Sequence, residues 1–114
     1  MKQAFLEAYR AKGTTGKNPN VGCVLVKNNF IIARARTSPG GRPHAEENLI
    51  SQTSKAELKG SSLFVTLEPC AHKGINGTSC ADLISGSGIK EIFVSNRDPD
   101  LRTSGKGLKI LKKS

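Results

Sequence analysis

Four side chains of this sequence have the types and spacing of a metal-dependent catalytic centre. His44 and Glu46 stand two positions apart, and Cys70 and Cys80 follow later in the chain. One imidazole and two thiolates are ligands that zinc prefers, and three protein ligands leave the fourth tetrahedral position open for water. Glu46 would then be a carboxylate beside the metal that can move protons between water and a leaving group. The set therefore predicts a zinc site that activates water.

Each of these residues also has a structural interpretation. A loop histidine can be an ordinary hydrogen-bonded residue, and a cysteine in an apolar strand is usually a small core residue. We adopt the structural interpretation for Cys23, which lies within Val-Gly-Cys-Val. Cys70 and Cys80 stand in polar, glycine-rich surroundings, where packing gives no reason for a thiol. A closed structural zinc site with His72 as fourth ligand is the alternative, and it leaves Glu46 without a role.

The candidate residues lie at predicted helix starts or in the loops before them. A helix start suits a metal centre because its partial positive charge favours thiolates. Apolar residues at helical spacing predict the helices, and short apolar runs between turn residues predict the strands. Helices alternating with strands after an opening antiparallel hairpin predict a three-layer α/β/α sandwich on a mixed sheet. The predicted helices cover residues 1–11, 44–54, 80–85 and 108–111, and the predicted strands cover residues 21–26, 30–35, 62–67 and 89–95.

Length and composition are those of one globular domain. The chain has 114 residues, of which 36% are hydrophobic, and this length suits a single core. Glu7 and Arg10 interrupt the N-terminal segment before the apolar core of a signal peptide could form. The apolar run at 21–26 is too short to span a bilayer. Three cysteines without an export signal indicate metal ligands or free thiols, so we predict a cytoplasmic protein without membrane association.

The net charge of the chain predicts an anionic partner. It is +9 at neutral pH, from 18 basic and 9 acidic residues. Nucleic acid, a phosphorylated small molecule and an acidic surface would all be attracted by such a charge. The basic residues are spread along the chain, and the dense group near residue 114 is typical of a solvated helix face. Charge alone does not choose among these partners.

The order of the candidate residues resembles a known catalytic motif. His-x-Glu followed by Pro-Cys and a further Cys is similar to the motif of zinc-dependent nucleobase deaminases. In that chemistry zinc lowers the pKa of a bound water, which attacks the ring carbon bearing an exocyclic amine. The resemblance implies that Glu46 takes the water proton and protonates first a ring nitrogen and then the departing ammonia.

More specifically, the chain resembles the pyrimidine deaminase domain of bifunctional riboflavin biosynthesis proteins. The ten-position interval from Cys70 to Cys80 differs from the Cys-x-x-Cys of transfer-RNA adenosine and cytidine-type deaminases. The resemblance implies hydrolysis of a diaminohydroxyphosphoribosylaminopyrimidine to ammonia and 5-amino-6-(5-phosphoribosylamino)uracil. It rests on residues 18–24, 41–46, 65–72, 98–100 and 105–107, which together extend over almost the whole chain.

The resemblance also implies site residues and a substrate class. It assigns zinc to His44, Cys70 and Cys80 and the proton shuttle to Glu46. The positive charge of the chain suits a phosphorylated pyrimidine substrate. Two further residues, Asn18 and His72, fall where the family contacts its substrate, with loop capping and solvent exposure as their competing roles.

The C-terminal part departs from the resemblance. Family members continue past Leu111 into another strand and helix, and most then carry a reductase domain that uses a nicotinamide cofactor. Residues 1–114 therefore predict a single, C-terminally shortened deaminase domain without the last strand and helix and without a reductase domain. An open sheet edge promotes association. A homo-oligomer and a reductase on a separate chain are accordingly candidate partners.

Two other classes of function stay open from the sequence. A deaminase acting on bases in RNA would account for the +9 charge, although we expect a small phosphorylated substrate rather than nucleic acid. A catalytically inactive, zinc-stabilised module would account for the shortened C-terminus but not for an intact Glu46. Thr37 also stands where the family usually has a histidine that faces the substrate.

Overall fold

A computed structural model of the chain describes residues 1–16, 19–71, 79–96 and 105–113. Two predicted substrate contacts, Asn18 and His72, lie outside the described residues. Among the described helices, none has the length and apolar character needed to cross a membrane.

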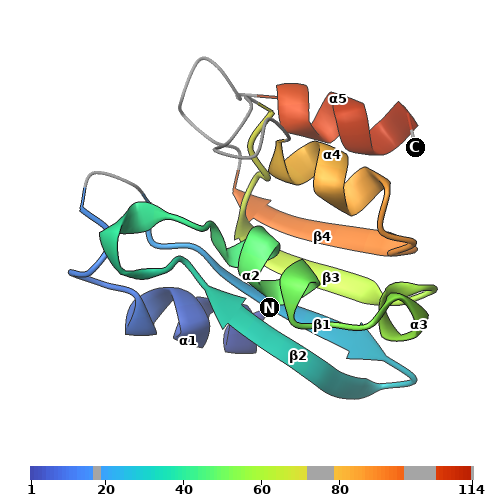
Figure 1. Cartoon of the computed structure of the whole chain (residues 1–114), viewed down its shortest axis with the longest axis horizontal. Coiled ribbons are helices and arrows are strands. Elements are labelled where there is room, and N and C mark those ends of the chain that lie inside the picture. The colour runs from blue at the N-terminus through green and yellow to red at the C-terminus, as the bar shows by residue number, and fades with distance from the viewer. Residues whose placement is uncertain (17–18, 72–78, 97–104, 114) are drawn as a thin grey trace.

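Four strands form one mixed sheet in the order β2-β1-β3-β4 (Figure 1). β1 (Gly22–Lys27) pairs antiparallel with β2 (Phe30–Arg36) through a turn of two asparagines that both have positive φ. Two consecutive positive-φ residues match the twist of a tight hairpin. β1 also pairs antiparallel with β3 (Ser62–Leu67), and β3 pairs parallel with β4 (Glu91–Asn96). The predicted mixed sheet and opening hairpin are confirmed.

Helices cover both faces of this sheet, which confirms the three-layer arrangement. In Figure 1, α1 lies behind the sheet while α2 and α4 lie in front of it. The last described helix, α5, packs on α4. The helices are α1 (Lys2–Arg10), α2 (Ala45–Ser51), α3 (Lys55–Leu58), α4 (Cys80–Ser85) and α5 (Lys106–Lys113), with a 3-10 turn at Pro39–Gly41.

Side-chain alternation along β1 makes the two faces of the sheet different. Gly22 lies against α1, and its neighbour Cys23 points to the opposite face, where it is completely buried in the main core. The structural interpretation of Cys23 therefore agrees with its position. The core cluster consists of Val21, Cys23, Leu25, Ala35, Ala45, Leu49, Leu58, Leu63, Val65 and Ile84.

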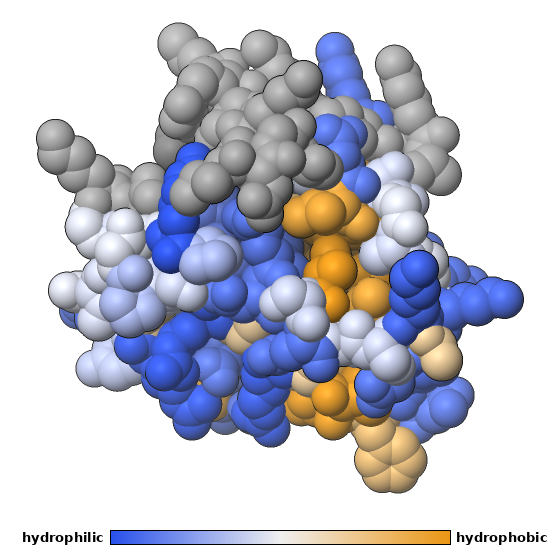
Figure 2. Space-filling model, viewed as in Figure 1, coloured by the Kyte–Doolittle hydropathy of each residue, from blue (hydrophilic) through white to orange (hydrophobic). Residues whose placement is uncertain are grey.

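The surface on the α2 and α4 side is mostly hydrophilic. Figure 2 shows this side, with a hydrophobic patch near its centre beside α4. Partly buried apolar residues pack against the core from several elements, among them Ile50, Ile92 and Leu111. The helices of this side therefore cover the core and leave a small apolar area in view.

One predicted boundary was wrong, and one helix was not predicted. α2 ends at Ser51, where the helix predicted at 44–54 was expected to fray, and a separate helix, α3, begins at Lys55. Ser54 and Glu57 form the capping box of α3: the Ser54 hydroxyl accepts from the Glu57 N–H at 3.2 Å, and the Glu57 carboxylate accepts from the Ser54 N–H at 3.4 Å. The Ser-x-x-Glu spacing is the sequence signal that predicts such a start. β4 also begins two residues later than the predicted start at 89.

The contact between α1 and β1 requires glycine at position 22. A Cβ atom there would overlap the backbone of α1 at the Ala4 carbonyl oxygen and the Ala8 nitrogen. We therefore expect Gly22→Ala to lower the free energy of unfolding by about 1–3 kcal/mol or more, as overpacked cores do. Urea unfolding of the metal-free protein measures the change.

Gly86→Ala is the matched control for this substitution. Gly86 follows α4 at φ −89°, and a Cβ atom there would meet only the Asp82 carbonyl oxygen, at 3.7 Å. An alanine fits this conformation and restricts the unfolded chain, so its stability should be unchanged or rise by up to about 1 kcal/mol. Equal unfolding midpoints for the two variants would contradict the close approach of α1.

Candidate metal centre

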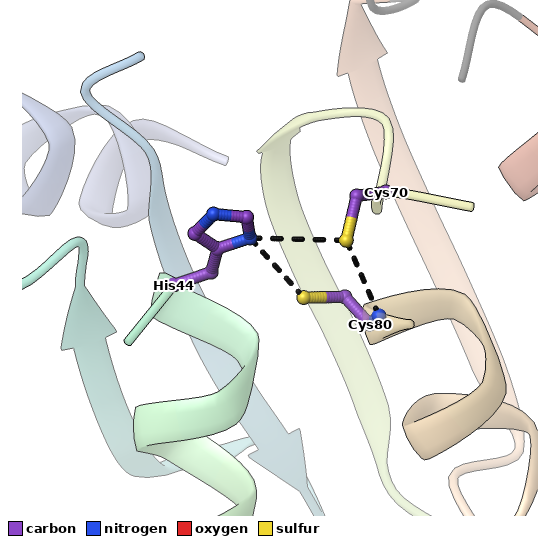
Figure 3. A group of neighbouring side chains, drawn as sticks. All are labelled: His44, Cys70 and Cys80. Atoms are coloured by element: carbon purple, nitrogen blue, oxygen red, sulfur yellow. Dashed lines mark hydrogen bonds between the residues drawn. The ribbon is translucent and has the colours of Figure 1, made fainter. Parts of the chain in front are cut away.

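The three predicted ligands come from three separate elements and meet at one point (Figure 3). His44 directly precedes α2, Cys70 lies in the loop after β3, and Cys80 is the first residue of α4. The Nδ1 atom of His44 lies 3.5 Å from the Cys80 Sγ and 3.8 Å from the Cys70 Sγ. All three ligand atoms lie within 4.8 Å of one another. The predicted ligand set is therefore assembled by the fold.

These distances suit a tetrahedral zinc site. Zinc bonds of about 2.0–2.1 Å to nitrogen and about 2.3 Å to sulfur separate neighbouring ligand atoms by about 3.5–3.8 Å. Both cysteines are buried, with exposed fractions of 7% for Cys70 and 1% for Cys80. One imidazole and two thiols are also the donor types that zinc selects. The residues present fit a zinc ion with three protein ligands.

Helix capping places His44 and Cys80. The backbone N–H of His44 donates to the Glu47 carboxylate at 3.1 Å, which orients the residue at the start of α2. The Ser79 hydroxyl accepts from the Asp82 N–H at 3.1 Å and begins α4, so Cys80 becomes its first residue. Both ligands therefore stand at the positive end of a helix.

The start of α4 also holds Cys70. The Cys80 N–H donates to the Cys70 Sγ at 3.3 Å, and the Ala81 N–H donates to the Cys70 carbonyl oxygen at 3.0 Å. Two backbone donors of one helix start therefore bind the sulfur and the carbonyl of the same residue. This contact brings the loop after β3 against α4 and stabilises negative charge on the Cys70 sulfur.

Without metal, the three ligands share protons. Hydrogen bonds from Cys80 and His44 lower the pKa of the Cys70 thiol to about 4, against the effect of burial. The hydrogen bond to Cys70 and burial raise the pKa of Cys80 well above its ordinary value. The hydrogen bond to Cys70 also raises the pKa of His44. The thiolate form of Cys70 is therefore favoured in the metal-free site, and a metal that binds there must displace the proton of Cys80.

Glu46 is a buried carboxyl group beside these ligands. It lies in the first turn of α2, is 3% exposed, and interacts electrostatically with His44 and Cys70. Burial raises the pKa of Glu46 to about 7, although a backbone hydrogen bond and the charge of His44 oppose the rise. A carboxyl group with a pKa near neutrality can both accept and donate a proton at physiological pH.

The raised pKa of Glu46 predicts a pH dependence of stability in the metal-free protein. In the unfolded chain this carboxyl group ionises near its ordinary pKa of 4.5, whereas in the folded protein it ionises near pH 7. The stability it contributes is therefore complete below pH 4.5 and is lost as the pH rises through 7. Glutamine does not ionise, so Glu46→Gln lacks this loss. From low to high pH, the free energy of unfolding of the variant should therefore rise by about 2–3 kcal/mol relative to that of wild type.

Urea unfolding of both metal-free proteins at about pH 4.5 and pH 8 measures this difference. The two unfolding free energies should approach each other at the lower pH and separate at the higher one. A wild-type minus variant difference that is the same at both pH values would contradict a buried, protonated Glu46.

Thr37 has a structural role in the described part of the chain. Its side chain is 1% exposed, and its hydroxyl accepts from the Val21 N–H at 3.0 Å. The same hydroxyl donates to the Pro19 carbonyl oxygen, at 3.2 Å. Thr37 therefore joins the end of β2 to the segment that leads into β1. This is the position at which Thr37 departs from the family's usual histidine.

A separate cavity lies at the β2 edge of the sheet and contains none of the candidate ligands. Its volume is about 380 Å³, and its lining includes Arg34, Arg36, Asn48 and Gln52. The Asn48 amide donates to the Arg36 carbonyl oxygen at 2.9 Å, and the Gln52 amide donates to the Arg34 carbonyl oxygen at 2.7 Å. The amides of Asn48 and Gln52 thus hydrogen-bond two carbonyl oxygens of β2 that a further strand would need for pairing at this edge.

Comparison with known proteins places the chain in a family. The model of the cytidine and deoxycytidylate deaminase zinc-binding region matches residues 1–96. A diaminohydroxyphosphoribosylamino-pyrimidine deaminase from Buchnera aphidicola subsp. Acyrthosiphon pisum is 45% identical over 114 residues, which span 99% of this chain and 76% of that protein. The riboflavin biosynthesis protein RibD of Aquifex aeolicus is 42% identical, over 98% of this chain and 31% of its own length.

A solved structure agrees with these relatives. The diaminohydroxyphosphoribosylaminopyrimidine deaminase/5-amino-6-(5-phosphoribosylamino)uracil reductase of Thermotoga maritima superposes with a TM-score of 0.90 at 41% identity, over 99% of this chain and 32% of that chain. The present chain thus spans about three quarters of the Buchnera deaminase and about a third of the longer proteins. The chain belongs to the cytidine and deoxycytidylate deaminase zinc-binding family, in the branch of the pyrimidine deaminases of riboflavin biosynthesis.

Proposed function

We propose that the chain is a zinc-dependent hydrolytic deaminase of riboflavin biosynthesis. Its substrate would be a diaminohydroxyphosphoribosylaminopyrimidine, and its products 5-amino-6-(5-phosphoribosylamino)uracil and ammonia. The observation that carries the proposal is the meeting of His44, Cys70 and Cys80 around a point where zinc fits, with the buried carboxyl group of Glu46 beside them. The 45% identity to the Buchnera deaminase supports the choice of substrate.

In this proposal His44, Cys70 and Cys80 hold the zinc through Nδ1 and the two sulfur atoms. When bound, zinc supplies an activated water as the nucleophile for the ring carbon that carries the amine. The Cys70 thiolate, already stabilised by backbone donors, provides negative charge at the site before the metal arrives. Burial of the two sulfur ligands keeps solvent away from the thiolates.

Glu46 carries the protons of the reaction. Its carboxylate accepts a proton from the attacking water and passes one to the ring nitrogen. Glu46 then takes the second proton from the hydroxyl group added to the ring carbon and passes it to the exocyclic amine. The amine leaves as ammonia while the ring carbon becomes a carbonyl. Water is consumed and one ammonia is released, so atoms and charges balance. Burial of the Glu46 carboxyl group raises its pKa in the metal-free site, which favours a group that can return a proton as well as accept one.

The substrate assignment is tested by ammonia release from the zinc-loaded chain. We expect release from the diaminohydroxyphosphoribosylaminopyrimidine and none from an RNA stem-loop or from deoxycytidylate. The metal-free chain is the control and should be inactive. Release from the RNA alone would replace the proposal with the RNA-directed deaminase. No release from any of the three, with one zinc bound per chain, would favour the inactive zinc-stabilised module.

We also propose partners for this deaminase in the cytoplasm. The uracil product must be reduced in the next step, and a reductase on a separate chain would supply that reaction; the Thermotoga protein carries both activities in its name. β4 is the second edge of the described sheet and supports a homo-oligomer. Sedimentation velocity tests the assembly, and a monomer at high concentration would count against it. Asn18 and His72 stay predicted substrate contacts.

A further inference from the structure

A second buried carboxylate lies close to the metal centre and is not used by the proposed reaction. Glu68 directly follows β3, stands two residues before Cys70, and is 2% exposed. A buried carboxylate must be hydrogen-bonded or its burial is costly. Glu68 accepts two backbone N–H groups from the far end of the chain. Gly105 donates to its Oε1 at 3.0 Å, and Leu108 donates to its Oε2 at 3.2 Å.

These two donors belong to the first turn of α5. Gly105 precedes the helix, and its carbonyl oxygen accepts the first helical hydrogen bond from Lys109 at 3.1 Å. Leu108 is the third helical residue. In a local capping box the side chains at these two positions would accept each other's N–H groups. The side chains of glycine and leucine have no acceptor. The carboxylate of Glu68, which follows β3, accepts both N–H groups instead. Its negative charge also lies at the positive end of α5.

The first turn of α5 also packs closely against Glu68 and Pro69. A Cβ atom at Gly107 would overlap the Pro69 carbonyl oxygen and lie 3.2 Å from the Glu68 Oε2. The first turn of α5 therefore rests directly on the backbone of residues 68 and 69. A side chain at position 107 would push the helix away from the segment that leads into Cys70.

The segment from Glu68 to Cys70 is held on three sides. The Glu68 N–H donates to the Asn96 carbonyl oxygen at the end of β4, at 2.8 Å. Cys70 receives the N–H groups of Cys80 and Ala81 at the start of α4. The side chain of Glu68 adds the third attachment, to α5, which itself packs on α4. These contacts join the segment that carries the Cys70 sulfur to β4, α4 and α5.

We infer that Glu68 is a positioning residue for the metal centre: by capping α5 from the end of β3, it fixes the loop that presents the Cys70 thiolate. The inference rests on the proposed ligand set of His44, Cys70 and Cys80. The two buried glutamates then have separate tasks. Glu46 moves protons, whereas Glu68 is not one of the residues whose ligand atoms meet and acts through Cys70.

Zinc affinity of Glu68 variants tests this inference. Competition with a chromophoric chelator should show zinc binding about 10–100-fold weaker in Glu68→Ala, the usual effect of removing an outer contact of a metal ligand. Glu68→Gln keeps one acceptor oxygen and should lose less. Cobalt replacing zinc reports the geometry, and its thiolate charge-transfer absorption should change in both variants. In the metal-free proteins, amide exchange at Gly105 and Leu108 should speed up.

Ser54→Ala is the matched control, because it removes the capping box of α3 and touches no part of the metal centre. It should lower the melting temperature and leave the zinc affinity and the cobalt spectrum of the folded protein as in wild type. Gly107→Ala disturbs the contact between α5 and Glu68 from the helix side. It should therefore also weaken zinc binding, although Glu68 itself is unchanged. It also serves as the test if Glu68→Ala does not fold.

Two outcomes would overturn the inference. Wild-type zinc affinity and an unchanged cobalt spectrum in Glu68→Gln and Gly107→Ala, while Cys70→Ser binds no zinc, would overturn the role of Glu68 alone. Absence of zinc binding by the wild-type chain would overturn the ligand set and the inference with it. The first result leaves the proposed deaminase standing, so the two failures are distinguishable.

Discussion

Zinc-loaded Glu46→Gln is expected to release ammonia at least about a hundredfold more slowly than the wild-type chain, because it lacks the group that accepts and returns the proton. Glutamine has nearly the same size and occupies the same buried position in the first turn of α2. Glu46 is not among the three residues whose ligand atoms meet. The variant should therefore still bind one zinc, and a loss of rate with zinc retained separates proton transfer from metal binding.

Glu47→Gln is the control for this result. Glu47 is the next residue of the same turn, and its carboxylate accepts the N–H of His44. Glutamine can also accept that bond in a capping box, so the activity should fall less than about tenfold, below the usual contribution of a general acid-base group. Equal losses in the two variants would mean that negative charge near the start of α2, rather than proton transfer by Glu46, supports the reaction.

Cys70→Ser is expected to abolish stable zinc binding, and with it the stabilisation of the fold by the metal. A ligand that binds only the folded state adds about 2.7 kcal/mol at a concentration one hundred times its dissociation constant. A chelator should therefore lower the melting temperature of the wild-type chain and have no effect on Cys70→Ser. Thermal unfolding with and without chelator, together with zinc content by mass spectrometry, measures both effects.

Cys23→Ser separates metal ligation from burial of a thiol. Cys23 is completely buried in the core, where burial raises the pKa of its thiol. Serine there should destabilise the protein through the buried hydroxyl but leave one zinc bound and the chelator effect intact. Equal zinc loss in Cys23→Ser and Cys70→Ser would show that the ligand assignment is wrong.

Local patterns in the sequence predicted most of the elements that position the site. Ser79 predicted the start of α4 and Gly86 or Gly88 its end, and the structure places Ser79 and Gly86 at the two ends. The hairpin of β1 and β2 followed from two apolar runs with a short connection. Such signals are readable because capping, turn formation and side-chain alternation depend on residues only a few positions apart. The donor types of the ligand set, one imidazole and two thiols, likewise favour zinc whatever their arrangement.

Tertiary structure decided the contacts between distant segments. The sequence did not predict that Glu68 caps α5, because its two donors lie 37 and 40 positions away and neither carries a side-chain signal. The sequence showed Thr37 only as a departure from the family's usual histidine, and the structure adds that its hydroxyl bonds to the backbone of residues 19 and 21. The lowered pKa of Cys70 and the raised pKa of Glu46 likewise arise only when separate elements enclose them. Burial and charge proximity are properties of packing, and packing depends on the whole chain.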